Sequence, residues 1–170
     1  MKKLLILFLA LVLLISVPAC STQGTGGNDK GSGNSNLEGS LDDILAQIYE
    51  KAELEDSFRE YIETGLMKTE ITAENCASYF GVDLEFESGL ASEPVMMPSA
   101  YLLALIRVKE GADIEKIKAD IKANADPMRW ICVGVDPANV FVENVGDVVV
   151  LIMSDNAGQA LKDAFLSLGK

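Results

Sequence analysis

Ala100-Tyr-Leu-Leu-Ala-Leu-Ile-Arg-Val108 is the stretch that decides the fold, because it is almost wholly apolar. A strand with apolar side chains at successive positions is typical of the middle of a sheet, where both faces are covered over most of the strand's length. Gly111 breaks the stretch, and Asp113 is placed to cap a helix with isoleucines on its inner face and lysines on its outer face. The sequence therefore predicts a central strand followed by an amphipathic helix.

The chain beyond that helix predicts a β-hairpin and a last helix. Residues 139–145 and 147–153 are rich in β-branched residues and lie on either side of Gly146. Asp155 is expected to cap the last helix, which has a broad apolar face. This face comprises Ala157, Ala160, Leu161, Ala164, Phe165 and Leu168.

The chain ahead of the central strand begins with helices. Ser40 is a good N-cap, and the apolar residues after it recur at helical spacing. Residues 53–67 fit a helix face less well, since Gly65 weakens the helix. A short helix over 73–80 is expected to end at Gly81.

The pattern then changes from a helical to an extended one. Three acids alternate with two large apolar residues over 83–87, which indicates a half-buried edge strand. Two prolines interrupt residues 93–98, so this segment is expected to be a connection.

These elements predict one α+β domain over residues 40–170, with the order α-α-β-β-α-β-β-α. Neighbouring strands with short links pair antiparallel. The expected architecture is therefore a two-layer domain, in which helices cover one face of a four-stranded, mainly antiparallel sheet.

The amino terminus has the layout of an export signal. Two lysines precede an unbroken apolar run over 4–15, which is shorter than the roughly 20 residues that span a bilayer. Val17-Pro-Ala-Cys20 follows, and it resembles the cleavage box of bacterial lipoprotein signals. The resemblance implies cleavage between Ala19 and Cys20, with acyl chains such as palmitate attached at Cys20. Residues 1–19 are thus expected to be a lipoprotein signal peptide, and an uncleaved anchor or ordinary secretion are the alternatives.

Residues 20–39 are expected to form a flexible tether behind the lipidated Cys20. They are rich in glycine, serine and asparagine, and Leu37 is the one large apolar residue among them. Such a segment cannot build a core, and as a coil it spans on the order of 25 Å. The expected location is the extracytoplasmic face of the cell membrane, with the lipid on Cys20 as the contact with the membrane.

The composition argues against several classes of function. The net charge is −12, and residues 1–19 hold two lysines and no acid, so cleavage would leave the mature chain still more acidic. Nucleic acids need a basic surface, so no nucleic-acid partner is expected. The absence of histidine removes the Ser-His-Asp and Cys-His arrangements and histidine-based metal sites. We expect no cofactor, and we expect that the protein is not an enzyme.

Two cysteines remain for the folded domain. Cys76 and Cys132 both lie in apolar surroundings, and residues 128–135 are expected to bring Cys132 back to the core. One interpretation is a disulfide between them, since an extracytoplasmic compartment permits it. The other is two buried free thiols, which are common in cores.

Three segments together resemble a known family. They are Leu105-Ile-Arg-Val-Lys-Glu-Gly-Ala-Asp113, Asp126-Pro-Met-Arg-Trp-Ile-Cys-Val133 and Val145-Gly-Asp-Val-Val-Val-Leu-Ile-Met-Ser154. They are similar to clostridial lipoproteins grouped as domain of unknown function 4358, and the likeness covers roughly the last two thirds of the domain. The resemblance implies a Gram-positive, cell-surface lipoprotein, and it brings no assigned activity.

The acids on the expected edge strand are a candidate metal site. Asp83, Glu85 and Glu87 offer carboxylate oxygens, which suit calcium. They do not match a calcium-loop pattern. A solvated, charged strand edge is the simpler interpretation, since such edges also prevent aggregation.

Three apolar residues are candidates for ligand or partner contacts. Met96 and Met97 lie between two prolines and could contact a soft metal or a partner, although packing in the core is the simpler interpretation. Trp130 beside Arg129 could stack on a sugar, although a buried packing role is favoured by its apolar neighbours.

No recognisable catalytic set remains, so the leading hypothesis is a ligand- or partner-binding module of the cell envelope. One alternative is a carboxylate-based hydrolase of envelope glycans, which needs two acids about 5–10 Å apart in a cleft. The other is a structural spacer without a ligand.

Overall fold

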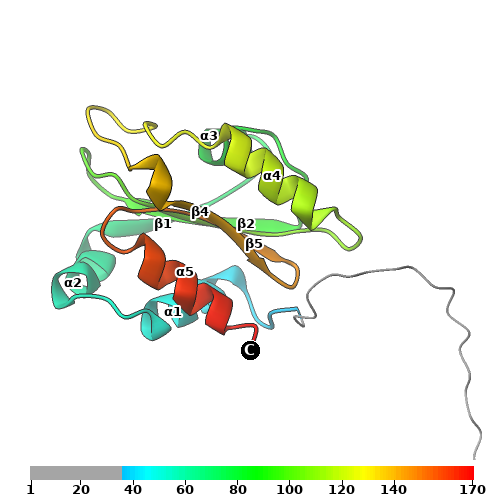
Figure 1. Cartoon of the computed structure of the whole chain (residues 1–170), viewed down its shortest axis with the longest axis horizontal. Coiled ribbons are helices and arrows are strands. Elements are labelled where there is room, and N and C mark those ends of the chain that lie inside the picture. Colours follow the sequence, from blue (N-terminus) through cyan, green and yellow to red (C-terminus); the bar gives the residue numbers. More distant parts are fainter. Residues whose placement is uncertain (1–35) are drawn as a thin grey trace, which may run out of the picture. The chain divides into compact units, whose positions relative to one another are not determined.

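Five antiparallel strands form one open sheet in the order β1-β2-β3-β5-β4 (Figure 1). The computed structural model describes residues 36–170, so the predicted signal peptide, Ala19, Cys20 and most of the predicted tether lie outside the described residues. The strands are β1 (Leu66–Glu70), β2 (Ser88–Pro94), β3 (Leu102–Arg107), β4 (Val140–Val145) and β5 (Val148–Met153). The prediction that the stretch over 100–108 forms a central strand is confirmed, because β3 lies between β2 and β5.

Helices cover both faces of this sheet, so the predicted two-layer arrangement with helices on one face is wrong (Figure 1). One face carries α1 (Leu41–Lys51), α2 (Asp56–Thr64) and α5 (Gly158–Ser167), and the other carries α3 (Cys76–Phe80) and α4 (Ile114–Asn124). The physical reason is that β3 and β5 are apolar at almost every position, so a single helical layer would leave one apolar face in water.

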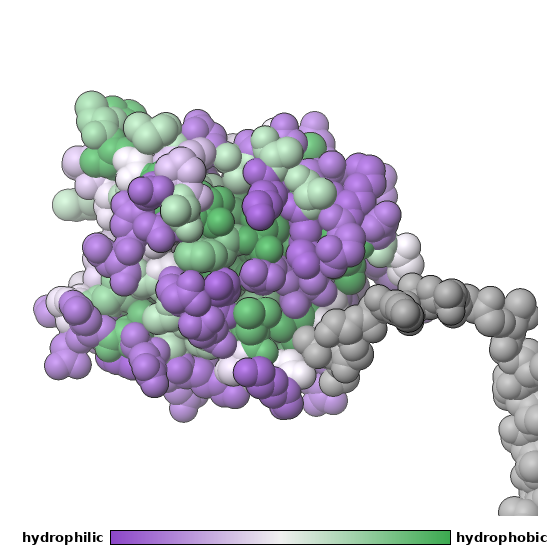
Figure 2. All heavy atoms as spheres, in the orientation of Figure 1, coloured by the Kyte–Doolittle hydropathy of each residue, from purple (hydrophilic) through white to green (hydrophobic). Residues whose placement is uncertain are grey.

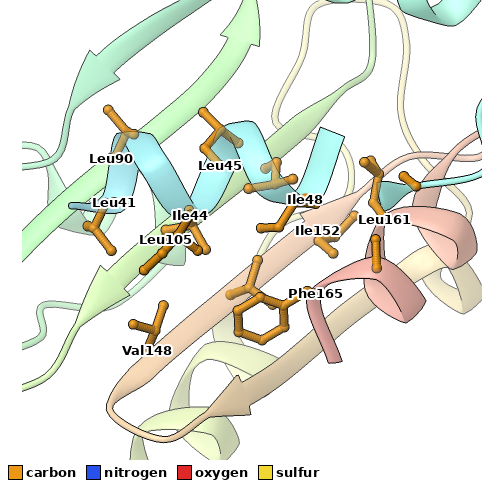
Figure 3. Packing of buried hydrophobic residues seen from close by; sticks show 14 of the residues in the cluster. Leu41, Ile44, Leu45, Ile48, Leu90, Leu105, Val148, Ile152, Leu161 and Phe165 are labelled. Carbon is orange, nitrogen blue, oxygen red and sulfur yellow. The ribbon is translucent and has the colours of Figure 1, made fainter. Parts of the chain in front are cut away.

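The alternation of side chains along β3 divides the core in two. Leu103 and Leu105 belong to the cluster under α1 and α5, whereas Leu102, Ala104 and Ile106 belong to the cluster under α3 and α4. Figure 3 shows the first cluster, in which the leucines and isoleucines of α1 lie over the sheet beside Phe165 and Leu161 of α5.

The sheet has five strands rather than the predicted four. The additional strand is β1. The sequence pattern does not indicate it, because its residues are mostly polar and directly follow the helical residues 56–64. The predicted edge strand over 83–87 is irregular, and β2 begins only at Ser88. Leu84 and Phe86 still pack against the second cluster, and the acids that alternate with them are exposed. The alternating pattern therefore predicted which side chains are buried, although the segment is not a strand.

Local capping signals account for several helix boundaries. Ser40 forms a capping box with Asp43, and the side chain of Asp113 accepts a hydrogen bond from the backbone N–H of Lys116, both as predicted. Gly81 ends α3 in the left-handed conformation, with φ of 72°. The predicted cap at Asp155 is wrong, because α5 begins at Gly158 behind Ala157.

Asp155 instead connects two loops. Its Oδ1 accepts a hydrogen bond from the backbone N–H of Asp136 and another from Asn139 Nδ2, each at 2.9 Å. The short helix η1 (Pro137–Asn139) is thereby held against the link between β5 and α5. Ser154 stabilises the turn before α5, because its Oγ accepts a hydrogen bond from the backbone N–H of Ala157 at 3.2 Å.

Arg107, at the end of β3, holds residues 37–39, the last residues of the predicted tether. Its guanidinium donates to the carbonyl oxygens of Leu37 and Gly39 at 3.1 and 2.9 Å, and it forms an ion pair with Asp147 at 2.6 Å. Leu37 also packs against the first core cluster. The domain therefore begins a few residues before Ser40.

Both cysteines of the domain are free, so no disulfide joins Cys76 and Cys132. Cys76 is buried, with its Sγ 3.6 Å from the carbonyl oxygen of Val82, and burial raises the pKa of its thiol. Cys132 is exposed, in a loop that turns through a positive φ of 64° instead of returning to the core. Between Asn36 and Lys170, no helix combines the length and apolar character that crossing a membrane requires.

Candidate functional site: a pocket at one end of the sheet

A cavity of about 820 Å³ opens where β3 begins and β5 ends. We call it the sheet-end pocket. It is lined by residues from four segments, 53–61, 99–101, 133–134 and 154–157. These segments are the start of α2 with the residues before it, the approach to β3, the loop after α4, and the link from β5 to α5. The pocket thus depends on pieces that are far apart in the sequence and meet only in the fold.

Three aromatic rings in mutual contact form part of the wall. Phe58, Tyr61 and Tyr101 pack edge-to-face, with ring centroids 5.6–6.5 Å apart. Tyr101 is almost fully buried at the base, whereas Phe58 and Tyr61 are half-buried. The group is anchored by the core on one side and reaches the cavity on the other, so it presents a fixed apolar surface to a ligand.

Hydrogen bonds hold the tyrosines in place. The Tyr49 hydroxyl lies 2.7 Å from the Tyr101 hydroxyl and donates to Ser92 Oγ at 2.8 Å, and the Tyr61 hydroxyl lies 2.6 Å from Ser99 Oγ. Burial raises the pKa of Tyr49, and it raises the pKa of Tyr101 well above its ordinary value of 10.0. These two hydroxyls are therefore neutral at physiological pH and act through hydrogen bonds alone.

The charged side chains of the pocket are all acidic. Glu53, Glu55 and Asp155 line it, and none of its lining residues is a lysine or an arginine. Arg59 on α2 does not compensate, because its guanidinium donates to the carbonyl oxygens of Ala52 and Tyr49 at 2.9 and 3.5 Å. The pocket therefore suits a neutral or a positively charged molecule better than an anion.

Small polar groups complete the lining. Ser57, Ser99, Ser154 and Asn156 contribute hydroxyl and amide groups. Hydrolysis by paired carboxylates requires one acid in apolar surroundings, which raises its pKa. Glu53, Glu55 and Asp155 are exposed residues, and the hydrolase alternative stays a prediction.

Trp130 lies outside the pocket. It is buried in the second core cluster, which confirms the packing role. The Arg129 guanidinium carbon lies 4.9 Å from the centroid of the Tyr79 ring and 5.8 Å from that of Trp130. Burial lowers the pKa of Arg129, whose Nη1 is buried without a hydrogen-bond partner.

Met96 and Met97 are 76% and 50% exposed, so the prediction that they pack in the core is wrong. They lie in the loop before Ser99, and a second loop carries the exposed Met128 and Ile131. Figure 2 shows hydrophobic surface gathered over this second loop, between α4 and η1, at the upper left. Both loops border the sheet-end pocket through the residues they contribute to its lining.

The predicted acidic cluster is dispersed along an exposed segment. Glu85 forms an ion pair with Lys109 at 3.1 Å, and the backbone N–H of Glu87 bonds to the carbonyl oxygen of Arg107 at 2.8 Å. Neither these acids with Asp83 nor any other His, Cys, Asp or Glu side chains form a metal-binding group of three or more within residues 36–170.

Sequence reasoning missed the sheet-end pocket. The available signal was Ser154-Asp-Asn-Ala157, four small or polar residues directly after a fully buried strand. Within this stretch the sequence pattern predicts only a helix cap, at Asp155. Neither a family model, nor a curated protein, nor a solved structure matches the chain, so the resemblance to the clostridial lipoproteins stays a prediction.

Proposed function

We propose that the protein is a lipid-anchored binding module of the cell envelope whose sheet-end pocket takes a small hydrophilic ligand. The observation that carries the proposal is the cavity of about 820 Å³ with rings, hydroxyls and carboxylates in its lining. Cavities of about 300–1,000 Å³ with a few convergent polar groups are typical of small-molecule sites.

The position of the pocket supports this role. Tyr101 lies at the pocket just before β3, whereas Arg107 ends β3 where the last tether residues are held. The strand between them spans about 20 Å. The pocket thus lies at the opposite end of β3 from residues 37–39, which lead out of the domain towards the expected anchor.

A melting screen tests the proposal on the full-length protein, extracted from membranes in mild detergent. Sugars, amines and amino acids are added singly. A true ligand at about 100 times its Kd stabilises the fold by about 2.7 kcal/mol, which raises the Tm by a few degrees. A screen in which no compound raises the Tm contradicts the proposal.

Two matched variants assign any binding to the pocket. Ser57→Trp puts a large ring on an exposed lining position of α2, and Thr64→Trp puts the same ring on an exposed position of α2 outside the lining. The ligand should stabilise the wild type and Thr64→Trp, and should lose most of its effect on Ser57→Trp. Equal stabilisation of both variants would place the binding elsewhere.

A further inference from the structure

We infer that the ligand of the sheet-end pocket is an organic cation, either a quaternary ammonium or a protonated amine that carries apolar groups. The inference rests on the proposed function and narrows its ligand class. Two features of the pocket support it together: the sign of its charges and its aromatic wall.

The charges favour a cation because two carboxylates of the pocket lining have no partner within the described domain. Asp155 is engaged with the loop around η1, as described above. Glu53 and Glu55 make no side-chain hydrogen bond or ion pair to any residue of the described domain. Two such carboxylates attract a positive group and repel a negative one.

The aromatic wall favours a cation with alkyl groups over a bare metal ion. Phe58 and Tyr61 are half-buried, and their edge-to-face contacts with Tyr101 fix their orientation. A cation that packs against the face of such a ring gains about two- to fivefold in affinity for each ring at a partly exposed site. Methyl and methylene groups also remove apolar surface from water against the same rings.

The helix ends at the pocket do not reverse this preference. Both α2 and α5 begin there, and the start of a helix attracts anions. Glu55 and Asp56 occupy the beginning of α2, and Asp155 precedes α5. These acids offset the partial positive charge of both helix ends.

Calorimetry with choline and its neutral isostere 3,3-dimethyl-1-butanol tests the inference on the full-length protein in detergent. The two molecules have nearly the same shape and differ in charge, so their comparison isolates the cation. We expect choline or spermidine to bind at least about tenfold more tightly than the isostere. Binding of the isostere as tight as that of choline would overturn the inference.

Two pairs of charge-neutralising substitutions assign the effect to the pocket. Glu53→Gln with Glu55→Gln should weaken choline binding about fivefold or more. Glu60→Gln with Glu63→Gln removes the same charge from exposed positions outside the lining, and should change the affinity less than twofold. Equal weakening by both pairs would show that only the net charge matters, and would overturn the inference.

The outcomes separate this inference from the proposed function. A neutral sugar that binds and is blocked by Ser57→Trp, together with no binding of choline or spermidine, overturns the cation and leaves the proposed function standing. Failure of every sugar, amine and amino acid overturns both.

Discussion

At the scale of single residues, the Tyr49 hydroxyl is the shared hydrogen-bond partner of two buried side chains behind the pocket. It joins Ser92 Oγ and the Tyr101 hydroxyl, and Ser92 and Tyr101 are each only 2% exposed. Tyr49→Phe removes the shared partner of both groups, and we expect a loss of about 1–3 kcal/mol in the free energy of unfolding. Tyr101→Phe leaves the bond from Tyr49 to Ser92 intact, so its cost should be about 1 kcal/mol.

Urea unfolding of the two variants measures this difference. Tyr61→Phe serves as a comparison, since it removes a single bond to Ser99 and leaves the Tyr49 bonds untouched. If Tyr49→Phe proves no more destabilising than Tyr101→Phe, the claim that Ser92 and Tyr101 both depend on the Tyr49 hydroxyl is wrong.

Tyr79 makes the fold sensitive to alkaline pH. Burial, which is the largest cause, and Glu93, whose carboxylate accepts a hydrogen bond from the Tyr79 hydroxyl at 2.7 Å, together raise the pKa of Tyr79 to about 12. The unfolded chain ionises this tyrosine near pH 10, whereas the folded chain keeps it neutral. Its contribution to stability is therefore complete below pH 10 and is lost as the pH rises towards 12.

Unfolding free energies measured between pH 9 and pH 11.5 check this expectation. The wild type should lose stability steeply above pH 10, and Tyr79→Phe should lose it less steeply. Part of the slope will remain in the variant, because the pKa values of Tyr49 and Tyr101 are raised as well. Identical slopes in the two proteins would contradict the assignment to Tyr79.

At the scale of elements, Gly81 sets how closely α3 approaches α4. Both Gly81 and Gly111 have a positive φ, of 72° and 79°, so alanine is strained at each by about 1–2 kcal/mol. A Cβ at Gly81 would lie 1.9 Å from the carbonyl oxygen of Asn124, at the end of α4, whereas nothing lies within 4 Å of a Cβ at Gly111. We expect Gly81→Ala to cost about 2–5 kcal/mol and Gly111→Ala about 1 kcal/mol.

Thermal unfolding of the two alanine variants tests the close approach. They share the backbone strain and differ in the contact, so their difference isolates the packing of α3 on α4. Equal Tm values would show that α4 can move away at no cost.

Much of this element plan could be predicted because its signals are local. The central strand, the hairpin around Gly146, and the caps at Ser40 and Asp113 follow from residues within a few positions of each other. The strand β1 could not be predicted, because its polar residues form a strand only by pairing with β2. The pocket was missed for a similar reason, since its four segments meet only after the sheet has formed.

The number of helical layers follows from the apolar pattern of the two central strands. A strand with apolar side chains on both faces requires cover on both faces. The six residues of β5 are all buried, and five of the six in β3 are buried as well. Helices on one face alone are incompatible with that pattern, and three layers follow from it.

At the scale of the whole molecule, the expected lipid on Cys20 decides where the pocket operates. Cys20→Ala should leave the folded domain intact, because the described domain begins well after this residue. Without acyl chains the protein should move from the membrane fraction to the soluble fraction, since two or more chains are needed for stable anchoring. Fractionation of cells with an antibody against the domain measures this, and unchanged membrane recovery of the variant would contradict the anchor.

The central claim is that a ligand binds in the sheet-end pocket, and backbone NMR of the isotopically labelled full-length protein in detergent tests it most directly. Choline and, separately, glucose are titrated while amide shifts are followed. The account predicts that the shifts with at least one of them concentrate at residues 53–61, 99–101, 133–134 and 154–157. Shifts confined to the α3–α4 face, or no shift with either compound, would contradict it.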